Sequence, residues 1–431
     1  MPGIPKIGWK TAAGLVIANM IGTGVFTSLG FQVTALKNTW SIVLLWSLGG
    51  VMALIGAFSY AELGTHFKRS GGDYVFLSKI FHPVLGYLYA WVSLTVGFSA
   101  PVAIAAMAMT NYLSPFIPEF WGRWMGITII LTVSAIHSVS IRQSGRFQDM
   151  ATLLKVVFIV VLIGIGFWMV PEVTPSLNFD ASWKSELLLP GFAVSLIYVS
   201  FAYTGWNAAA YIVEEIRMPG KNLPRALIGG TLLVMVLYIV LQLVLLRHAS
   251  VAQLDGKVEV ATIAFSNLFP KNGSAWISFF IALQLVGTIS GYLWVGPRIT
   301  QAMAREYRLW KPLAKTNAAG IPVKALWVNT AISIALALTG SFEQVLLYTG
   351  FVLQLMGTLS VAALLFVKRS EHTFKSPWRP VPQLVFILFS IWITVYMLYD
   401  RPLESLAGLG IMVLGGLIYM FDRKTERSKN E

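Results

Sequence analysis

The chain has 431 residues, of which 56% are hydrophobic and 12% are charged, and its mean hydropathy is +0.70. A soluble domain of this length needs more charge to cover its surface, so a water-soluble globular protein is excluded. The net charge of +13 comes from basic residues spread over many short segments, which favours a membrane topology over nucleic-acid binding. The sequence contains no cysteine, so these residues form neither a disulfide nor a thiolate metal site.

Twelve apolar stretches have about the length needed to cross a hydrocarbon core roughly 30 Å thick. They are residues 11–33, 41–61, 84–110, 125–141, 150–170, 190–213, 226–246, 273–297, 325–341, 344–366, 381–399 and 405–421. Backbone groups in lipid must be hydrogen-bonded within their own segment, so we expect helices. The sequence predicts an all-α membrane protein of about twelve transmembrane helices, in a single domain over residues 1–431.

Lysine and arginine indicate how these helices are oriented. When loops are assigned to alternate sides, one side carries 24 of the 32 basic residues and the other carries 7, and Lys155 falls within a span. The more basic side of a membrane protein is normally cytoplasmic. We therefore expect both termini in the cytoplasm, and the composition and brief termini favour the plasma membrane. We expect the first apolar stretch to be a span because it is too long for a signal-peptide core.

Two of the twelve stretches contain residues that weaken a helix. The first contains Gly22-Thr23-Gly24, and the sixth contains Thr204-Gly205-Trp206-Asn207. Glycine and β-branched threonine are unfavourable inside a helix. The two stretches are five crossings apart and enter the membrane from opposite sides, so the span count predicts inverted repeats at about 9–170 and 190–367, followed by two helices at about 380–421. Interrupted segments at matching positions indicate a transporter's binding site, and simple glycine kinks at helix contacts are the alternative.

The two interruptions suit a ligand that carries both charges. Free amides after the break in the first stretch lie at a positive helix end, which favours a carboxylate. Free carbonyls before the break in the sixth stretch favour an ammonium group. An α-amino acid carries both groups on one carbon. The predicted substrate-binding residues are Ile21, Gly22, Thr23, Gly24, Phe201, Ala202, Tyr203, Thr204, Gly205, Trp206 and Asn207.

Several motifs, taken in order along the chain, resemble those of the amino acid–polyamine–organocation permeases. They are Ile21-Gly22-Thr23-Gly24-Val25-Phe26, Tyr60-Ala61-Glu62-Leu63-Gly64, Ser70-Gly71-Gly72-Asp73-Tyr74, Phe201-Ala202-Tyr203-Thr204-Gly205-Trp206-Asn207, and Asn222-Leu223-Pro224-Arg225-Ala226. The last two, with the acidic pair between them, are most similar to the L-type amino acid transporter branch. These motifs cover about residues 10–230, and the number of spans extends the resemblance over the chain.

The resemblance implies a LeuT-type fold of two inverted five-helix repeats with broken helices 1 and 6, alternating access, and neutral amino acids as the usual cargo. It implies that the carboxylate is held by Ile21, Thr23 and Gly24, and the amine by Phe201, Ala202 and Thr204. Phe201 is the implied aromatic outer gate, with Trp206 and Asn207 beside the pocket. The L-type pattern often has glycine at the position of Thr204, a difference that favours small substrates.

Lys155 is the one basic residue within a predicted span. It lies roughly 10 Å from the end of that span at about 1.5 Å per residue, so it either snorkels to the membrane surface or has a function inside the membrane. The resemblance implies that its ammonium replaces the ion of sodium-coupled relatives. The lysine then either carries a transported proton or is a fixed cation, with Thr288 and Ser290 as expected polar neighbours.

These features predict sodium-independent transport of small or neutral L-amino acids by exchange or facilitated diffusion. A proton-coupled symporter and a non-transporting amino-acid sensor are the alternatives. The uncharged spans lack the residues of an intramembrane enzyme and the histidines lack metal-ligand spacing, so we expect no catalytic residue, cofactor or metal. Apart from substrate and bilayer we expect no nucleic acid and no disulfide-linked accessory subunit, and a homo-oligomer stays open. Glu62, at a cytoplasmic helix end, is expected to be either ion-paired or solvated.

Overall fold

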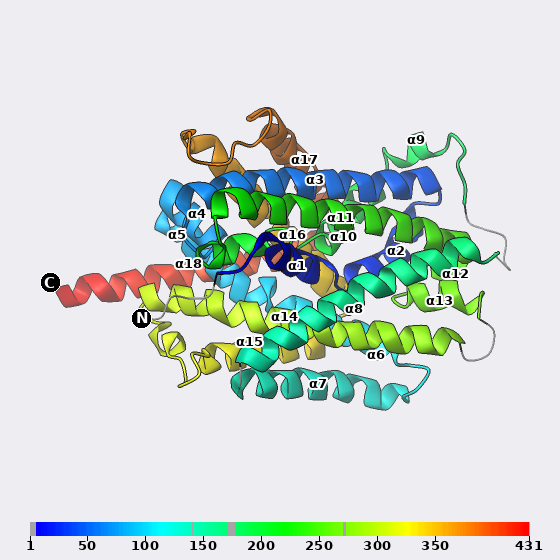
Figure 1. Cartoon of the computed structure of the whole chain (residues 1–431), viewed down its shortest axis with the longest axis horizontal. Coiled ribbons are helices and arrows are strands. Elements are labelled where there is room, and N and C mark those ends of the chain that lie inside the picture. Colours follow the sequence, from blue (N-terminus) through cyan, green and yellow to red (C-terminus); the bar gives the residue numbers. More distant parts are fainter. Residues whose placement is uncertain (1–5, 140, 171–176, 270–272, 431) are drawn as a thin grey trace.

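The computed structural model describes residues 6–139, 141–170, 177–269 and 273–430. Over these ranges the regular structure is helical, and the one β-type contact is an isolated parallel bridge between Ile7 and Ile216. Figure 1 shows the long helices running side by side along the long axis of the molecule. Helices α4 and α5 lie at one end of this bundle, with the end of α18, and α9, α12 and α13 lie at the other.

The helices follow one another along the chain without a long soluble insertion. They are α1 (Trp9–Met20), α2 (Gly24–Ala35), α3 (Thr39–Phe67), α4 (Asp73–Ile80), α5 (Pro83–Val92), η1 (Ser93–Gly97), α6 (Ser99–Tyr112), α7 (Glu119–Val139), α8 (Ile141–Trp168), α9 (Trp183–Glu186), α10 (Pro190–Ala202), η2 (Ala208–Glu215), α11 (Pro219–His248), α12 (Val251–Leu254), α13 (Val260–Ser266), α14 (Gly273–Glu306), η3 (Lys311–Ala314), α15 (Val323–Thr339), α16 (Phe342–Ala363), η4 (Leu364–Phe366), α17 (Val381–Asp400) and α18 (Pro402–Asn430).

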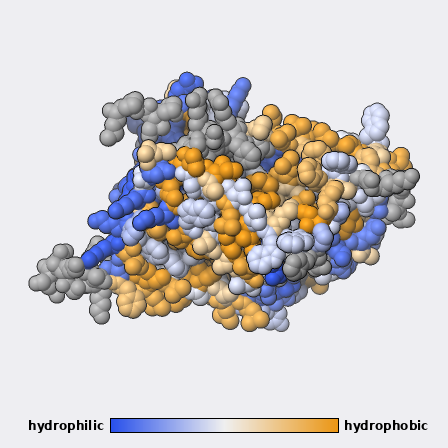
Figure 2. All heavy atoms as spheres, turned by 90° about the horizontal axis from the view of Figure 1, so that it is seen from below, coloured by the Kyte–Doolittle hydropathy of each residue, from blue (hydrophilic) through white to orange (hydrophobic). Residues whose placement is uncertain are grey.

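Eight helical stretches within the described residues are long and apolar enough to cross a membrane. They are Trp9–Ala35, Thr39–Phe67, Pro83–Tyr112, Pro219–His248, Gly273–Glu306, Phe342–Phe366, Val381–Asp400 and Pro402–Asp422, and the shorter apolar helices are Thr152–Trp168, Pro190–Ala202 and Val323–Thr339. Figure 2 shows apolar side chains over much of the middle of one face, with hydrophilic ones gathered toward the ends. The chain is therefore a multi-pass helical membrane protein, and the number of twelve crossings stays a prediction.

Contacts between loops gather the connections at two ends of the bundle. At one end, the amide of Ile7 donates to the carbonyl of Glu215 over 2.8 Å, and the amide of Leu309 donates to Asp422 over 2.9 Å. At the other end, the amide of Lys37 donates to Glu186 over 2.9 Å. Each of these contacts joins segments that the alternating assignment places on the same side of the membrane.

The third predicted span contains an irregularity that the sequence prediction missed. Helix α5 passes into α6 through the single π-turn η1, in which the amide of Phe98 donates to the carbonyl of Ser93 over 2.9 Å. Pro101 has no amide to donate to the carbonyl of Gly97. The hydroxyl of Ser99 donates to a different carbonyl, that of Leu94, over 2.7 Å. Proline and a competing hydroxyl are recognised causes of such a widened turn.

Glu62 at the end of α3 is buried rather than solvated. Its carboxylate accepts from the guanidinium of Arg379 over 2.7 Å and from the amide of Ser376 over 2.8 Å. Only 2% of the Glu62 side chain is exposed, against 9% for Arg379. These contacts hold residues 376–379, which precede α17, against the C-terminal end of α3.

Two groups of packed helices surround the centre of the molecule. In one group, α3 and α1 both pack against α11; in the other, α6 packs against α14 and α15. Helix α10 packs against α3 of the first group and also against α2, α16 and α17, so it joins the first group to the C-terminal helices. The helix interruptions described next lie between the two groups.

Candidate substrate-binding site

Two of the central helices are interrupted. The helical conformation stops between α1 and α2, over residues 21–23, and between α10 and η2, over residues 203–207. Both stretches contain one of the glycines that weaken a helix in the sequence, Gly22 and Gly205. Gly205 has a φ of +103°, a left-handed conformation that side chains disfavour. The interruptions leave helix ends with free amides and carbonyls inside the protein.

The two interruptions are in direct backbone contact with each other. A Cβ placed on Gly24 would lie 2.5 Å from the Cα of Ala202. A Cβ placed on Gly205 would lie 2.6 Å from the carbonyl carbon of Asn19. Only glycine permits approaches this close. The first residue of α2 therefore touches the last residue of α10, and the turn after α10 touches the last turn of α1.

This contact brings opposite helix ends together. The start of α2 is the positive end of one helix dipole, and the end of α10 is the negative end of another. Gly24 and Ala202 mark these two ends. Groups of opposite partial charge within a few ångströms of one another match the carboxylate and the ammonium of one amino-acid backbone.

Side chains from neighbouring helices hold the main chain around the first interruption. The hydroxyl of Tyr238 donates to the carbonyl of Met20 over 2.6 Å, and the side-chain amide of Gln242 donates to the carbonyl of Val25 over 3.1 Å. Both donors come from α11. Because these carbonyls have partners outside their own helix, the broken segment keeps a defined shape without regular helical bonding.

Lys155 lies on α8 and points into the protein. Its ammonium donates to the carbonyl of Ile21 over 2.7 Å, to the hydroxyl of Thr288 over 2.9 Å, and more weakly to the carbonyl of Ala18 over 3.4 Å. The side chain is 1% exposed, so it does not snorkel to the membrane surface. A cation at the carbonyl end of α1 complements the negative end of that helix.

Ser290, predicted as a neighbour of Lys155, lies elsewhere. Its hydroxyl is 2.8 Å from Nε2 of His137 on α7, and Thr288 alone of the two contacts the ammonium. Residues two apart on a helix point in nearly opposite directions, so one turn of α14 cannot direct both side chains at the same group. The contact with the ammonium therefore comes from Thr288, and a role of Ser290 beside Lys155 stays a prediction.

A cavity of about 100 Å³ adjoins the two interruptions. Four of the eleven predicted binding residues line it, namely Thr204, Gly205, Trp206 and Asn207. The residues not among its lining are Ile21, Gly22, Thr23, Gly24, Phe201, Ala202 and Tyr203. The hydroxyl of Tyr203 donates to the carbonyl of Trp46 over 3.1 Å. The backbone amide and the hydroxyl of Thr204 both donate to the carbonyl of Phe201. The described cavity thus lies beside the Asn19–Gly205 contact and not over the start of α2.

Sequence reasoning missed the polar cluster on the far wall of this cavity. Asp73 at the start of α4 accepts from the hydroxyl of Tyr211 over 2.7 Å, from the amide of Asn207 over 3.5 Å, and from the hydroxyl of Tyr60. The hydroxyls of Tyr89 and Tyr211 also share a hydrogen bond. Asp73 is fully buried, and this burial raises the pKa of its carboxyl although hydrogen bonds with Tyr211 and Tyr89 act in the opposite direction. The motif around Asp73 was visible in the sequence, but nothing in its spacing showed that it folds back onto the sixth span.

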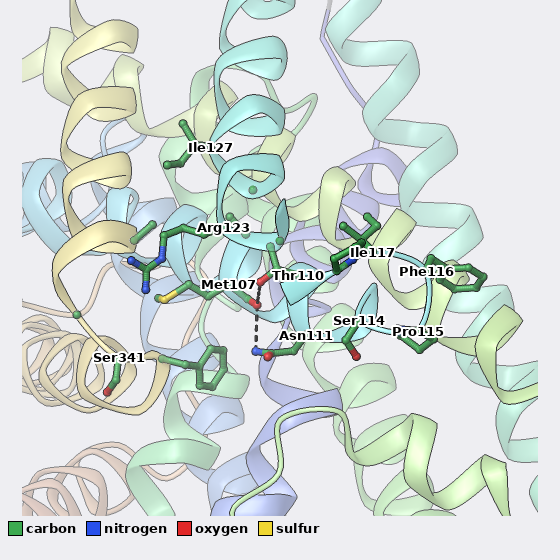
Figure 3. Close-up of a pocket in the computed structure, with 17 residues that line it drawn as sticks. Met107, Thr110, Asn111, Ser114, Pro115, Phe116, Ile117, Arg123, Ile127 and Ser341 are labelled. Atoms are coloured by element: carbon green, nitrogen blue, oxygen red, sulfur yellow. Dashed lines mark hydrogen bonds between the residues drawn. The ribbon is translucent and has the colours of Figure 1, made fainter. Parts of the chain in front are cut away.

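A larger cavity elsewhere contains none of the predicted binding residues. It measures about 720 Å³ and lies where α6 leads into α7, beside the start of α16. Figure 3 shows its polar residues Thr110, Asn111 and Arg123, and both Thr110 and Asn111 donate to the carbonyl of Met107. It is remote from the chemistry of the helix interruptions, so we do not assign substrate to it.

A helical membrane protein in which two interrupted helices meet beside an internal cavity belongs to the class of membrane transporters. Residues 7–420 match the sequence model of the family described as "Amino acid permease", and the chain belongs to this family. It is accordingly a transporter-family protein and not an enzyme.

Characterised relatives align over nearly the whole chain. "Large neutral amino acids transporter small subunit 2" of Oryctolagus cuniculus is 28% identical, and the alignment covers 96% of this chain and 79% of the relative. "b(0,+)-type amino acid transporter 1" of Homo sapiens is 27% identical over 96% of this chain and 87% of the relative. "Asc-type amino acid transporter 1" of Homo sapiens is 28% identical over 95% of this chain and 80% of the relative. The relatives are amino acid transporters by name.

Proposed function

We propose that the chain carries small or neutral L-amino acids across the membrane by alternating access. The observation that carries this proposal is the contact between Gly24 and Ala202, which brings the amide end of α2 to the carbonyl end of α10. Those ends suit the carboxylate and the ammonium of one zwitterion. Substrate then sits over this contact, held by residues 21–24 and 201–204, and its side chain extends toward the cavity lined by residues 204–207.

The size of the cavity supports a small cargo. Its volume of about 100 Å³ leaves room for a short side chain, and Thr204 fills space that a glycine at the same position leaves open. The proposed outer gate is Phe201, which is buried at the end of α10. The names of the relatives, one of which specifies large neutral amino acids, leave the substrate of this chain to experiment.

We further propose that transport is independent of sodium and proceeds by exchange or facilitated diffusion. The ammonium of Lys155 already bonds the carbonyl of Ile21 and the hydroxyl of Thr288, so a fixed cation occupies a position at the break where a metal ion would find carbonyl ligands. Proton symport is the second candidate, because a buried lysine is the kind of group that can release a proton. A non-transporting sensor is the remaining alternative.

The fold-level proposals follow from the same two interruptions. We propose a single domain of twelve crossings in a LeuT-type arrangement, with inverted repeats at about 9–170 and 190–367 and two further helices at about 380–421. The matching interruptions after α1 and α10 support this assignment. The excess of basic residues on one set of loops supports the proposal that both termini lie in the cytoplasm, and we propose the plasma membrane as the location.

The name of one relative describes a small subunit, which raises the question of a partner for this chain. The 431 residues contain no cysteine, so any assembly through them with an accessory subunit has to be non-covalent. Formation of a homo-oligomer is equally open to test, since blue native electrophoresis of the purified protein separates these arrangements from a monomer.

The test of the proposed function is uptake of radiolabelled alanine, serine and leucine into proteoliposomes. We expect uptake into vesicles preloaded with unlabelled amino acid, without sodium and without dependence on a proton gradient. Uptake into empty vesicles that requires an inward proton gradient, and that loses this requirement in Lys155→Ala, would establish symport instead. Binding of these amino acids without flux under any condition would leave the sensor.

A further inference from the structure

Two cavities meet at one wall in the half of the molecule that contains loop 69–74. The first is the cavity of about 100 Å³ beside the helix interruptions. The second, hereafter the vestibule, measures about 710 Å³ and is lined mainly by residues of the loop before α4, the first turn of α4, η2 and the second half of α14. Among the described lining residues, Tyr211 and Val295 are the two that border both cavities.

Tyr211 is held in this wall by its hydroxyl group. The hydroxyl donates to Asp73 over 2.7 Å, lies 3.0 Å from the amide nitrogen of Asn207, and shares a hydrogen bond with Tyr89. These partners come from α4, α5 and the turn before η2. A hydrogen bond to a charged group contributes about twice as much as a neutral one, so the carboxylate of Asp73 is the strongest single restraint on the ring.

Residues of the loop before α4 also form hydrogen bonds with the main chain of Tyr211 and Glu214. The amide of Gly71 donates to the carbonyl of Tyr211 over 3.1 Å, and the hydroxyl of Ser70 accepts from the amide of Glu214 over 3.2 Å. Gly72 has a φ of +52°, and a Cβ there would lie 2.5 Å from Cε1 of Tyr211. The run Ser70-Gly71-Gly72-Asp73 thus fits around the tyrosine from three sides.

We propose that Tyr211 is the inner gate between the substrate cavity and the vestibule, and that loop residues 70–73 form the latch that keeps it shut. This proposal depends on the proposed transport function, because a gate has a role only on a path that substrate takes. Release of substrate into the vestibule then requires the Tyr211 hydroxyl to leave Asp73 and the ring to swing away from Gly72. Asp73 acts through Tyr211 and is a positioning residue.

The absence of cysteine from the chain allows a test that does not depend on transport. Gly357 lines the cavity, and a Cβ there would meet no atom within 4 Å, so Gly357→Cys places a thiol in the cavity without strain. Ala302→Cys places one in the vestibule. The experiment measures how fast a charged, membrane-impermeant methanethiosulfonate reacts with each thiol when it is added from the vestibule side of reconstituted vesicles.

We expect Ala302→Cys to react readily and Gly357→Cys to react slowly. Adding Tyr211→Ala to Gly357→Cys should raise the labelling rate at least about ten-fold, and Tyr211→Phe or Asp73→Asn should raise it by a smaller factor, because each removes the charged hydrogen bond. Tyr74→Phe is the matched control: Tyr74 lines the vestibule but not the cavity, so it should leave the rate unchanged.

Two outcomes would overturn the gate. One is an unchanged labelling rate of Gly357→Cys in the Tyr211→Ala background; the other is an equal rise caused by Tyr74→Phe. A constant labelling rate of Ala302→Cys in every background shows that the variants are folded. If radiolabelled amino acids are not transported but the labelling rate of Gly357→Cys still depends on the residue at position 211, the proposed transport function is wrong. Tyr211 is then still a barrier between the two cavities.

Discussion

At the scale of single residues, the candidate site depends on places where no side chain fits. Gly24 and Gly205 each lie against main-chain atoms of the other interrupted segment, and Gly205 also has a left-handed φ. Other glycines, such as Gly14 on α1, have open space around them. The same residue type therefore has very different importance at different positions.

We predict that Gly205→Ala abolishes amino-acid exchange, whereas Gly14→Ala does not. The new Cβ at position 205 would lie 2.6 Å from the carbonyl carbon of Asn19 and in a disfavoured backbone conformation. Initial rates of uptake into preloaded proteoliposomes, at matched protein content, measure the difference. Wild-type rates in Gly205→Ala would show that the two interruptions do not need to touch.

Thr288 and Ser290 form a second contrast, two residues apart on α14. We predict that Thr288→Val reduces exchange by several-fold, because it removes one hydrogen-bond acceptor from the buried ammonium of Lys155. Ser290→Ala should have a smaller effect, since its partner is His137. Uptake measured over a range of substrate concentrations checks both variants, and equal losses in both would argue against a particular role for the ammonium.

At the scale of helices, much of the arrangement was accessible from the sequence. Long uncharged stretches dictate helices in lipid, and Gly22, Gly24 and Gly205 revealed where two of them stop. The π-turn at 93–97 was not accessible, because it depends on which carbonyl the hydroxyl of Ser99 finds after Pro101 removes a donor. Hydropathy alone does not distinguish such a turn from regular helix.

The site was predicted in part for a similar reason. Interrupted helices mark their own positions in the sequence, and residues 204–207 line a cavity in the structure, so their part in substrate binding stays a prediction. The wall formed by Asp73, Tyr89 and Tyr211 assembles from two parts of the chain that are far apart in sequence, the consecutive helices α4 and α5 and the later η2. Its formation depends on the path of the first loop, and a single sequence carries no periodic signal for such a path.

The ion pair between Glu62 and Arg379 predicts a measurable effect on stability. Glu62→Gln leaves a buried guanidinium without its counter-ion, which costs about 3 kcal/mol or more. Asp255→Asn breaks the exposed contact with Lys37, and exposed pairs contribute at most about 1 kcal/mol. We expect the melting temperature in detergent to fall clearly for Glu62→Gln and little for Asp255→Asn. Similar values would mean that the carbonyls of Leu364 and Val367, which also accept from the guanidinium of Arg379, are sufficient partners for it.

At the scale of the whole molecule, the loops form two separate sets at opposite ends of the bundle. Contacts such as Ile7 to Glu215 and Lys37 to Glu186 join loops within a set. The distribution of lysine and arginine assigns one set to the cytoplasm. The apolar surface of the bundle does not determine which end faces the cytoplasm, since such a surface fits the bilayer in either orientation.

We predict that a cysteine at Glu371 is cytoplasmic and one at Ser185 is external. Both positions are exposed and belong to different sets of loops. In intact cells, a membrane-impermeant maleimide should label Ser185→Cys and not Glu371→Cys, and permeabilised cells should show labelling of both. The reverse pattern in intact cells would invert the topology.

The reciprocal glycine contacts also limit which second substitutions in this chain could compensate for the loss of either glycine. Gly205 meets the backbone of Asn19, and Gly24 meets the backbone nitrogen and Cα of Ala202 as well as its Cβ. Trimming the neighbouring side chain therefore cannot make enough room for a bulkier residue at either position. Second-site suppressors of a substitution at Gly24 or Gly205 should map to the packing surfaces of α11 and α16, where a change displaces a whole helix. A suppressor screen in a strain that depends on this carrier would reveal which helices are free to shift.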